Sequence, residues 1–168
     1  MQSDGTFDNH ERVRKICRDL ERAGIICWFD SDRMTGTINK QMSRGIDDSD
    51  TVVGTITITL IITNTNTNTN TNTNTNTNII IVFITKTYID KVNGDNAADN
   101  CQLEFEYAAN TKTKAKMIAV VLDPNCRDTS KWVGTFGFFL RGELYVDFSN
   151  DSNFDNKIKM LIDEINKR

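Results

Sequence analysis

The stretch KMIAVVLD, residues 116–123, decides the class of fold. Its centre is apolar at successive positions, which is typical of a strand that is covered on both sides of a sheet. Pro124, the only proline in the chain, follows at once and ends the strand. Such strands occur in parallel sheets that lie between two layers of helices, so the stretch predicts an α/β fold.

The segments on either side of this strand continue an alternation of strand and helix. Residues 13–23 repeat apolar side chains with helical spacing, and Gly24 stands where a helix C-terminus favours glycine. Further helices are expected at residues 38–46, 101–111 and 154–165, further strands at 25–29, 52–62, 79–84 and 143–148, and loops at 85–100 and 132–142.

Composition limits the possible partners. The chain has 168 residues, which suits a single domain over residues 1–168, and its net charge is −3. This charge offers no basic field for nucleic acid or for an anionic membrane surface. No apolar stretch reaches membrane-spanning length, and the polar, acidic first residues do not resemble a signal peptide. We therefore expect a cytoplasmic protein that binds neither nucleic acid nor membrane.

The four cysteines are Cys17, Cys27, Cys101 and Cys126, and their spacing contains no CxxC pair. His10 is the only histidine. This pattern argues against a zinc site and favours buried, reduced thiols in the cytosol. The oxygen-rich run at residues 147–155 resembles a calcium loop, but it lacks the required glycine and glutamate. No metal and no cofactor are expected.

A strict Thr-Asn alternation occupies residues 63–78, between two strongly apolar segments. A two-residue repeat of uncharged polar side chains cannot build a core, so we interpret it as a low-complexity insertion. Added loop length costs little closure entropy, which makes such an insertion tolerable. The alternative is an assembly device in which asparagine ladders stack between chains.

Six segments of the chain carry a family resemblance. They are ICWFDSDRMTGTI, MSRGIDDSDTVV, VFITKTYIDKVNG, DNCQLEFEYA, KMIAVVLD and GELYVDFSND. Together they resemble a TIR (Toll/interleukin-1 receptor/resistance) domain, and they occur in the order of that family. The resemblance covers the chain from about His10 to its end, except for the repeat. It implies a flavodoxin-like fold with five parallel strands in the order 2-1-3-4-5, flanked by helices on both faces.

The chain departs from the family pattern in two places. The first family strand should precede the helix near His10, but the sequence there has no strand signal. In addition, residues 54–78 interrupt what the family has as one strand-centred unit. One interpretation is that TVVGTITITLII, residues 51–62, takes the place of the missing first strand in the sheet and that the repeat connects it to the next strand. The alternative is a truncated, inactive product.

TIR domains either cleave NAD between nicotinamide and ribose or only assemble signalling complexes. The resemblance implies that Glu104, in CQLE, is the catalytic carboxylate, with NAD as substrate. The alternative for Glu104 is an exposed carboxylate near a helix start, where the helix dipole favours any acid. Cleavage develops positive charge on the ribose, and a nearby anion stabilises this charge. The substrate-binding candidates are Asp32, Arg33 and Met34, in the loop at residues 30–36, and Asn100, four residues before Glu104.

Two sequence features leave the function open between these uses. Asn100 stands where enzymatic relatives often have tryptophan, which favours a non-catalytic adaptor. An intact CQLE favours the enzyme, activated when TIR units associate as homo-oligomers. In both cases the expected partners are other TIR domains, and the loop that carries Arg33 and Met34 is the expected contact.

Overall fold

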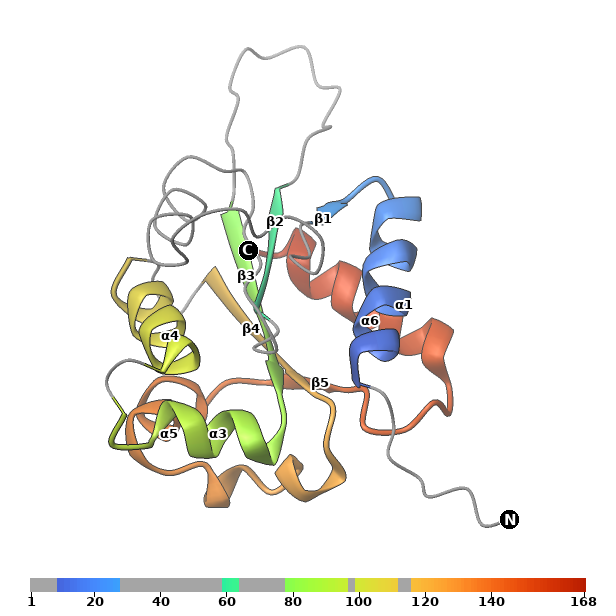
Figure 1. Cartoon of the computed structure of the whole chain (residues 1–168). Coiled ribbons are helices and arrows are strands. Elements are labelled where there is room, and N and C mark those ends of the chain that lie inside the picture. The colour runs from blue at the N-terminus through green and yellow to red at the C-terminus, as the bar shows by residue number, and fades with distance from the viewer. Residues whose placement is uncertain (1–8, 28–58, 64–77, 97–98, 112–115) are drawn as a thin grey trace.

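One sheet organises the described part of the chain. The computed structural model describes residues 9–27, 59–63, 78–96, 99–111 and 116–168 (Figure 1). Its strands form a five-stranded sheet in the order β1-β2-β3-β4-β5. They are β1 (Ile26–Cys27), β2 (Thr59–Thr63), β3 (Asn78–Ile84), β4 (Met117–Val121) and β5 (Tyr145–Asp147).

The strand directions define a mixed sheet. The pairs β3–β4 and β4–β5 are parallel, whereas β2 is antiparallel to both β1 and β3. Since β2 is reversed relative to both neighbours, β1 points in the same direction as β3. The expected α/β class is confirmed by the three adjacent parallel strands and their helices. The expectation of a wholly parallel sheet is wrong at β2, because a short apolar strand contains no information on its direction.

Helices cover both faces of the sheet. Helices α1 (Asn9–Arg22) and α6 (Phe154–Asn166) lie on one face. Helices α3 (Lys86–Val92), α4 (Asn100–Thr111) and α5 (Gly134–Leu140) lie on the other (Figure 1). Two short 3-10 helices, Pro124–Cys126 and Thr129–Lys131, follow β4. This arrangement gives the three layers that the apolar strands require.

The two faces of β3 and β4 contribute to separate cores. Ile79, Ile81 and Phe83 pack with α1 and α6, whereas Ile80 and Val82 pack with α3, α4 and α5. β4 alternates in the same way, and all its residues are buried. Burying one such aliphatic side chain contributes about 1.5–3 kcal/mol. These contacts explain why β4 is apolar throughout and why β3 is apolar at every position after its first residue, Asn78.

Two helices replace expected loops. α3 lies within residues 85–100, where Thr85 caps its start by accepting a hydrogen bond from the backbone N–H of Tyr88 at 3.1 Å. α5 lies within residues 132–142. Both are short and carry few periodic positions, and Gly134 and Gly137 obscure the helical pattern of α5. Their buried residues pack against the same side of the sheet.

β2 occupies the position between β1 and β3. The expectation that residues 51–62 take the place of the family's first strand stays a prediction: residues 59–62 of this segment belong to β2, which lies between β1 and β3 but runs antiparallel to both. Thr63 pairs with Asn78, so the first and last residues of the repeat lie side by side in the ladder. Part of the interrupting segment therefore belongs to the sheet and is not a loop. The expected helix at residues 38–46 lies outside the described residues.

Candidate functional site

Glu104 lies on α4, whose first turn is fixed by Asp99. The Asp99 side chain accepts a hydrogen bond from the backbone N–H of Cys101 at 2.8 Å, which satisfies one of the unpaired donors of a helix start. Desolvation opposes ionisation of Asp99, but hydrogen bonds from Cys101 and the charge of Lys91 keep its pKa below the ordinary value. The cap thus fixes where α4 begins and which residues it turns toward the sheet.

The Glu104 side chain is buried, with 6% of its surface exposed. One helical turn separates it from Cys101 on one side and from Ala108 on the other, and both of these residues face the core with Phe105. Glutamate is almost never fully buried in proteins without a compensating interaction. The exposed-carboxylate interpretation of Glu104 is therefore wrong: this acid lies on the inner side of its helix.

Glu106, two residues further along α4, has a different environment. It is half-buried and accepts a hydrogen bond from the Gln102 side-chain amide at 3.1 Å. This bond joins two residues one turn apart on the same helix, as expected for neighbouring side chains at a helix surface. Glu104 and Glu106 therefore form a matched pair of carboxylates on one helix, one buried and one half-buried.

The other expected substrate-binding residues are divided between the described and undescribed parts. Asn100 is the first residue of α4, one helical turn before Glu104. Asp32, Arg33 and Met34 lie outside the described residues. The structure therefore brings Asn100 and Glu104 onto one helix.

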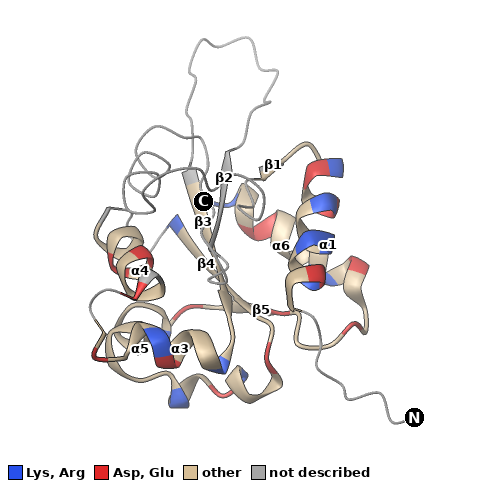
Figure 2. Ribbon diagram, in the orientation of Figure 1, with Lys and Arg blue, Asp and Glu red and all other residues tan. Residues whose placement is uncertain are grey.

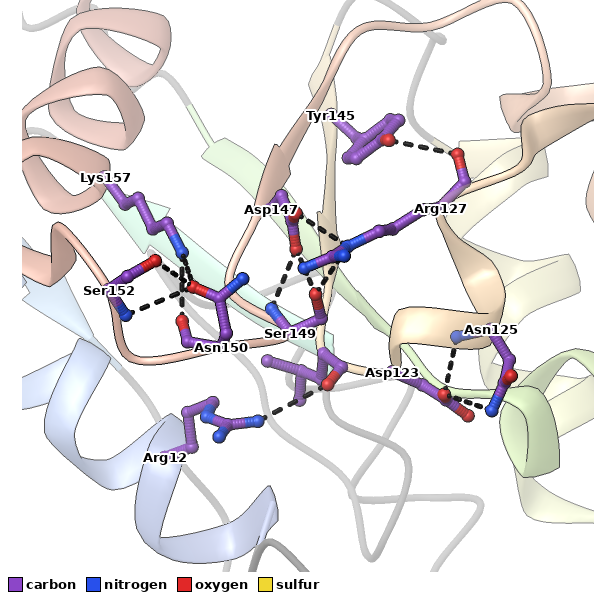
Figure 3. A network of polar contacts seen from close by, with 11 residues as sticks. Arg12, Asp123, Asn125, Arg127, Tyr145, Asp147, Ser149, Asn150, Ser152 and Lys157 are labelled. Carbon is purple, nitrogen blue, oxygen red and sulfur yellow. Dashed lines mark hydrogen bonds and ion pairs between the residues drawn. The ribbon is translucent and has the colours of Figure 1, made fainter.

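A second group of polar residues gathers where β4 and β5 end (Figure 3). Arg12 extends from α1, and its side chain is 5% exposed. Its guanidinium donates to the Leu122 carbonyl at 3.4 Å and to the Asp151 carboxylate at 3.3 Å. A buried guanidinium needs such acceptors, because unpaired burial of a charge is costly. Sequence reasoning missed Arg12. Its position next to Val13 and one helical turn before Ile16, both buried residues of α1, indicates that it lies near the inner side of the helix.

Arg127 and Asp147 form an ion pair in this group. The Arg127 Nε atom lies 2.9 Å from Asp147 and donates to the Ser149 hydroxyl at 2.9 Å. Desolvation opposes ionisation of Asp147, but hydrogen bonds from the Ser149 side chain and backbone and the charges of Arg127 and Lys157 lower its pKa. Tyr145 donates to the Arg127 carbonyl at 3.0 Å. These contacts hold the segment that follows β4 against β5.

The oxygen-rich run at residues 147–155 is explained by local turns. Asp147 accepts from the backbone N–H of Ser149 at 2.9 Å, and Asn150 accepts from that of Ser152 at 3.1 Å. Lys157 then donates to the Asn150 carbonyl at 2.9 Å. Asp and Asn side chains commonly stabilise turns in this way. Within the described residues, no three Asp, Glu, His or Cys side chains are grouped as metal ligands would be.

The charged residues of the described chain lie mainly on helices and connections (Figure 2). β3 and β4 contain no Asp, Glu, Lys or Arg. None of the helices in the described ranges is both long and apolar enough to cross a bilayer.

Comparisons with models of known protein families, with curated proteins and with solved structures found no match to this chain.

Proposed function

We propose that the chain is a TIR-type NAD nucleosidase, with Glu104 as its catalytic carboxylate. The observation that carries this proposal is the burial of Glu104 on α4, in the sequence CQLE. An acid withdrawn from solvent is less screened, so it stabilises a nearby positive charge more strongly than an exposed acid does. The products are nicotinamide and ADP-ribose, or a cyclic form of it.

The chemistry needs one anion next to the ribose. As the bond between the ribose C1′ and nicotinamide breaks, its electron pair passes to the nicotinamide nitrogen and neutralises the charge of the ring. The ribose becomes an oxocarbenium-like cation. The Glu104 carboxylate stabilises this cation and orients a ribose hydroxyl or the attacking water. Water then bonds to C1′ and releases a proton.

The arrangement of the sheet supports the same proposal. A flavodoxin-like TIR fold has a parallel strand between those at Ile26 and Ile79, and β2 lies between these two strands, although it runs antiparallel to both. The three parallel strands β1, β3 and β4 and the parallel β5 are the part of the sheet that agrees with this fold. α4 follows β3 through α3, which is the chain order that the resemblance implies for the catalytic helix. Arg33 and Met34 complete the proposed site, and TIR units act together by association.

Nicotinamide release from NAD by the purified full chain tests the proposal. Glu104→Gln keeps the size of the side chain and removes its charge, so release is expected to fall by about 100-fold or more. Glu106→Gln, on the same helix, is the matched control and should leave release unchanged. Circular dichroism of both variants checks that α4 remains folded.

Turnover that survives Glu104→Gln would refute the catalytic assignment. A second function, that of a non-catalytic TIR adaptor, is favoured by exposed apolar side chains around α5: Val133 is 55% exposed, Phe138 77% and Leu144 81%. The adaptor would release no nicotinamide from NAD at any protein concentration, whether wild-type or variant. The assay therefore separates the two functions.

A further inference from the structure

Two thiols from different elements meet on the α1 face of the sheet. Cys17 lies on the inner side of α1 and is 6% exposed, and Cys27 is a half-buried residue of β1. Both pack into the core formed with α6, where the two thiols lie close enough to interact, and the Cys27 thiol donates to the Ile25 carbonyl at 3.7 Å. Cys101 and Cys126 belong to the core on the opposite face. The sheet thus separates the paired cysteines from the other two.

The backbone between the two cysteines holds them in this position. α1 ends at Arg22, and Gly24 takes a positive φ of 83° that turns the chain back. The backbone N–H of Ile25 then donates to the Leu20 carbonyl at 3.1 Å. A glycine in this conformation is a common way to end a helix. The short connection from α1 to β1 therefore places β1 beside the last turns of α1 and brings Cys27 near Cys17.

We propose that Cys17 and Cys27 form an oxidisable dithiol, which closes to a disulfide on reaction with a low-molecular-weight disulfide such as oxidised glutathione. One of the two thiols loses its proton and, as the thiolate, attacks one glutathione sulfur, releasing the other glutathione as a thiolate. The second cysteine, also deprotonated, then attacks the sulfur of the first and releases the second glutathione. Two protein thiols are oxidised, and one glutathione disulfide is reduced to two thiols.

The surroundings of Cys27 make this oxidation slow at neutral pH. The hydrogen bond with Cys17, burial, and the negative charges of Cys17 and Glu21 on α1 all raise the pKa of Cys27. β2, on the other side of β1, carries no titratable side chain. Since the thiolate is the reacting species, the pair stays reduced in a reducing compartment and reacts faster at alkaline pH. This inference is independent of any activity toward NAD.

Peptide mapping of the native full chain tests the proposal. The protein is incubated with oxidised glutathione at mildly alkaline pH, free thiols are blocked, and the protein is digested with trypsin. Cleavage after Lys15, Arg18, Arg22 and Arg33 separates Cys17 in residues 16–18 from Cys27 in residues 23–33. A linked pair of these two peptides, absent after reduction, is expected. The thermal unfolding midpoint should rise by several degrees and return on reduction.

Variants provide the controls. Cys27→Ser should abolish the linked peptides, and the less buried position makes this variant easier to fold than Cys17→Ser. Cys126→Ser, on the opposite face, should leave them unchanged. A mixed disulfide at Cys27 that never closes, two free thiols after long incubation, or a link that forms only in denaturant would each overturn the proposal.

Discussion

At the scale of single residues, Gly137 shows how one absent methyl group allows a close packing contact. A Cβ atom at this position would lie 2.1 Å from the Trp132 carbonyl oxygen. That oxygen also accepts a hydrogen bond from Arg141 Nε at 2.9 Å. Trp132 is fully buried and donates from its indole to the Cys126 carbonyl at 2.9 Å. The start of α5 is thus fixed against Trp132 only because residue 137 has no side chain.

Gly137→Ala is expected to destabilise the protein by about 1–3 kcal/mol, because the added methyl group forces α5 away from Trp132. Urea unfolding followed by tryptophan fluorescence measures the change. Gly142→Ala is the matched control, since a Cβ atom there meets nothing within 4 Å. Equal stability of the two variants would contradict the close approach of α5 to Trp132.

Sequence reasoning finds residues of the site only where chemistry or periodicity distinguishes them. The resemblance to TIR domains makes Glu104 in CQLE a candidate, but its burial follows from its position between Cys101 and Ala108 on α4, which needs the helix boundary to be known. Arg12 was missed because a charged residue on a helix is usually solvated. The acceptors that make its burial possible, Leu122 and Asp151, are distant in sequence.

At the scale of elements, β2 is the part of the sheet that the sequence described least well. Its neighbours on both sides are hydrogen-bonded to it, because Ile62 pairs with Cys27 in β1 and with Ile79 in β3. The strand is predicted because residues 52–62 are rich in side chains that favour β-structure. The reversed direction was not predicted, since strand patterns specify faces and not polarity.

Ile62→Pro is expected to cost about 3 kcal/mol or more, because proline removes a ladder donor inside the sheet. Thr71→Pro, in the middle of the repeat, is the control and should have little effect. Thermal unfolding of both variants by circular dichroism gives the comparison. A small effect at both positions would mean that β2 does not contribute to the stable sheet.

The remaining elements differ in how clearly the sequence predicts them. β3, β4, α1 and α6 have long apolar or periodic patterns and were predicted within a few residues. α3 and α5 were missed because each is only seven residues long, so few positions repeat with helical spacing. Their helical state depends on tertiary contacts, such as the Asn93 side chain that donates to the Val133 carbonyl at 2.9 Å.

At the scale of the whole molecule, two arginines fasten the α1 and α6 layer to opposite ends of β4. Arg12 donates to the Leu122 carbonyl just after the strand. Arg168 donates to the Met117 carbonyl at its start at 2.8 Å and also bonds to Glu164 in α6 at 2.9 Å. β4 is also covered by α3, α4 and α5 on its other face. Like β3, it is therefore paired on both edges and covered on both faces.

This enclosure predicts the order of amide hydrogen exchange. The amides of β4 should exchange only when the whole protein unfolds, whereas those of β5, paired on one side in the described sheet, should exchange earlier. Native-state exchange with mass spectrometry measures both strands in one sample. Exchange of β4 as fast as that of β5 would show that the layers open separately.

The pairing of Thr63 with Asn78 has a consequence for changes in the number of repeat units in the gene. Short tandem repeats gain and lose whole units when DNA polymerase slips during replication, and each unit here encodes one threonine and one asparagine. Any such allele would still place a threonine after Ile62 and an asparagine before Ile79, so the same two residues would close the ladder. Because β2 and β3 run in opposite directions, their ends already meet, so a change in the number of repeat units would leave the paired residues of the sheet the same.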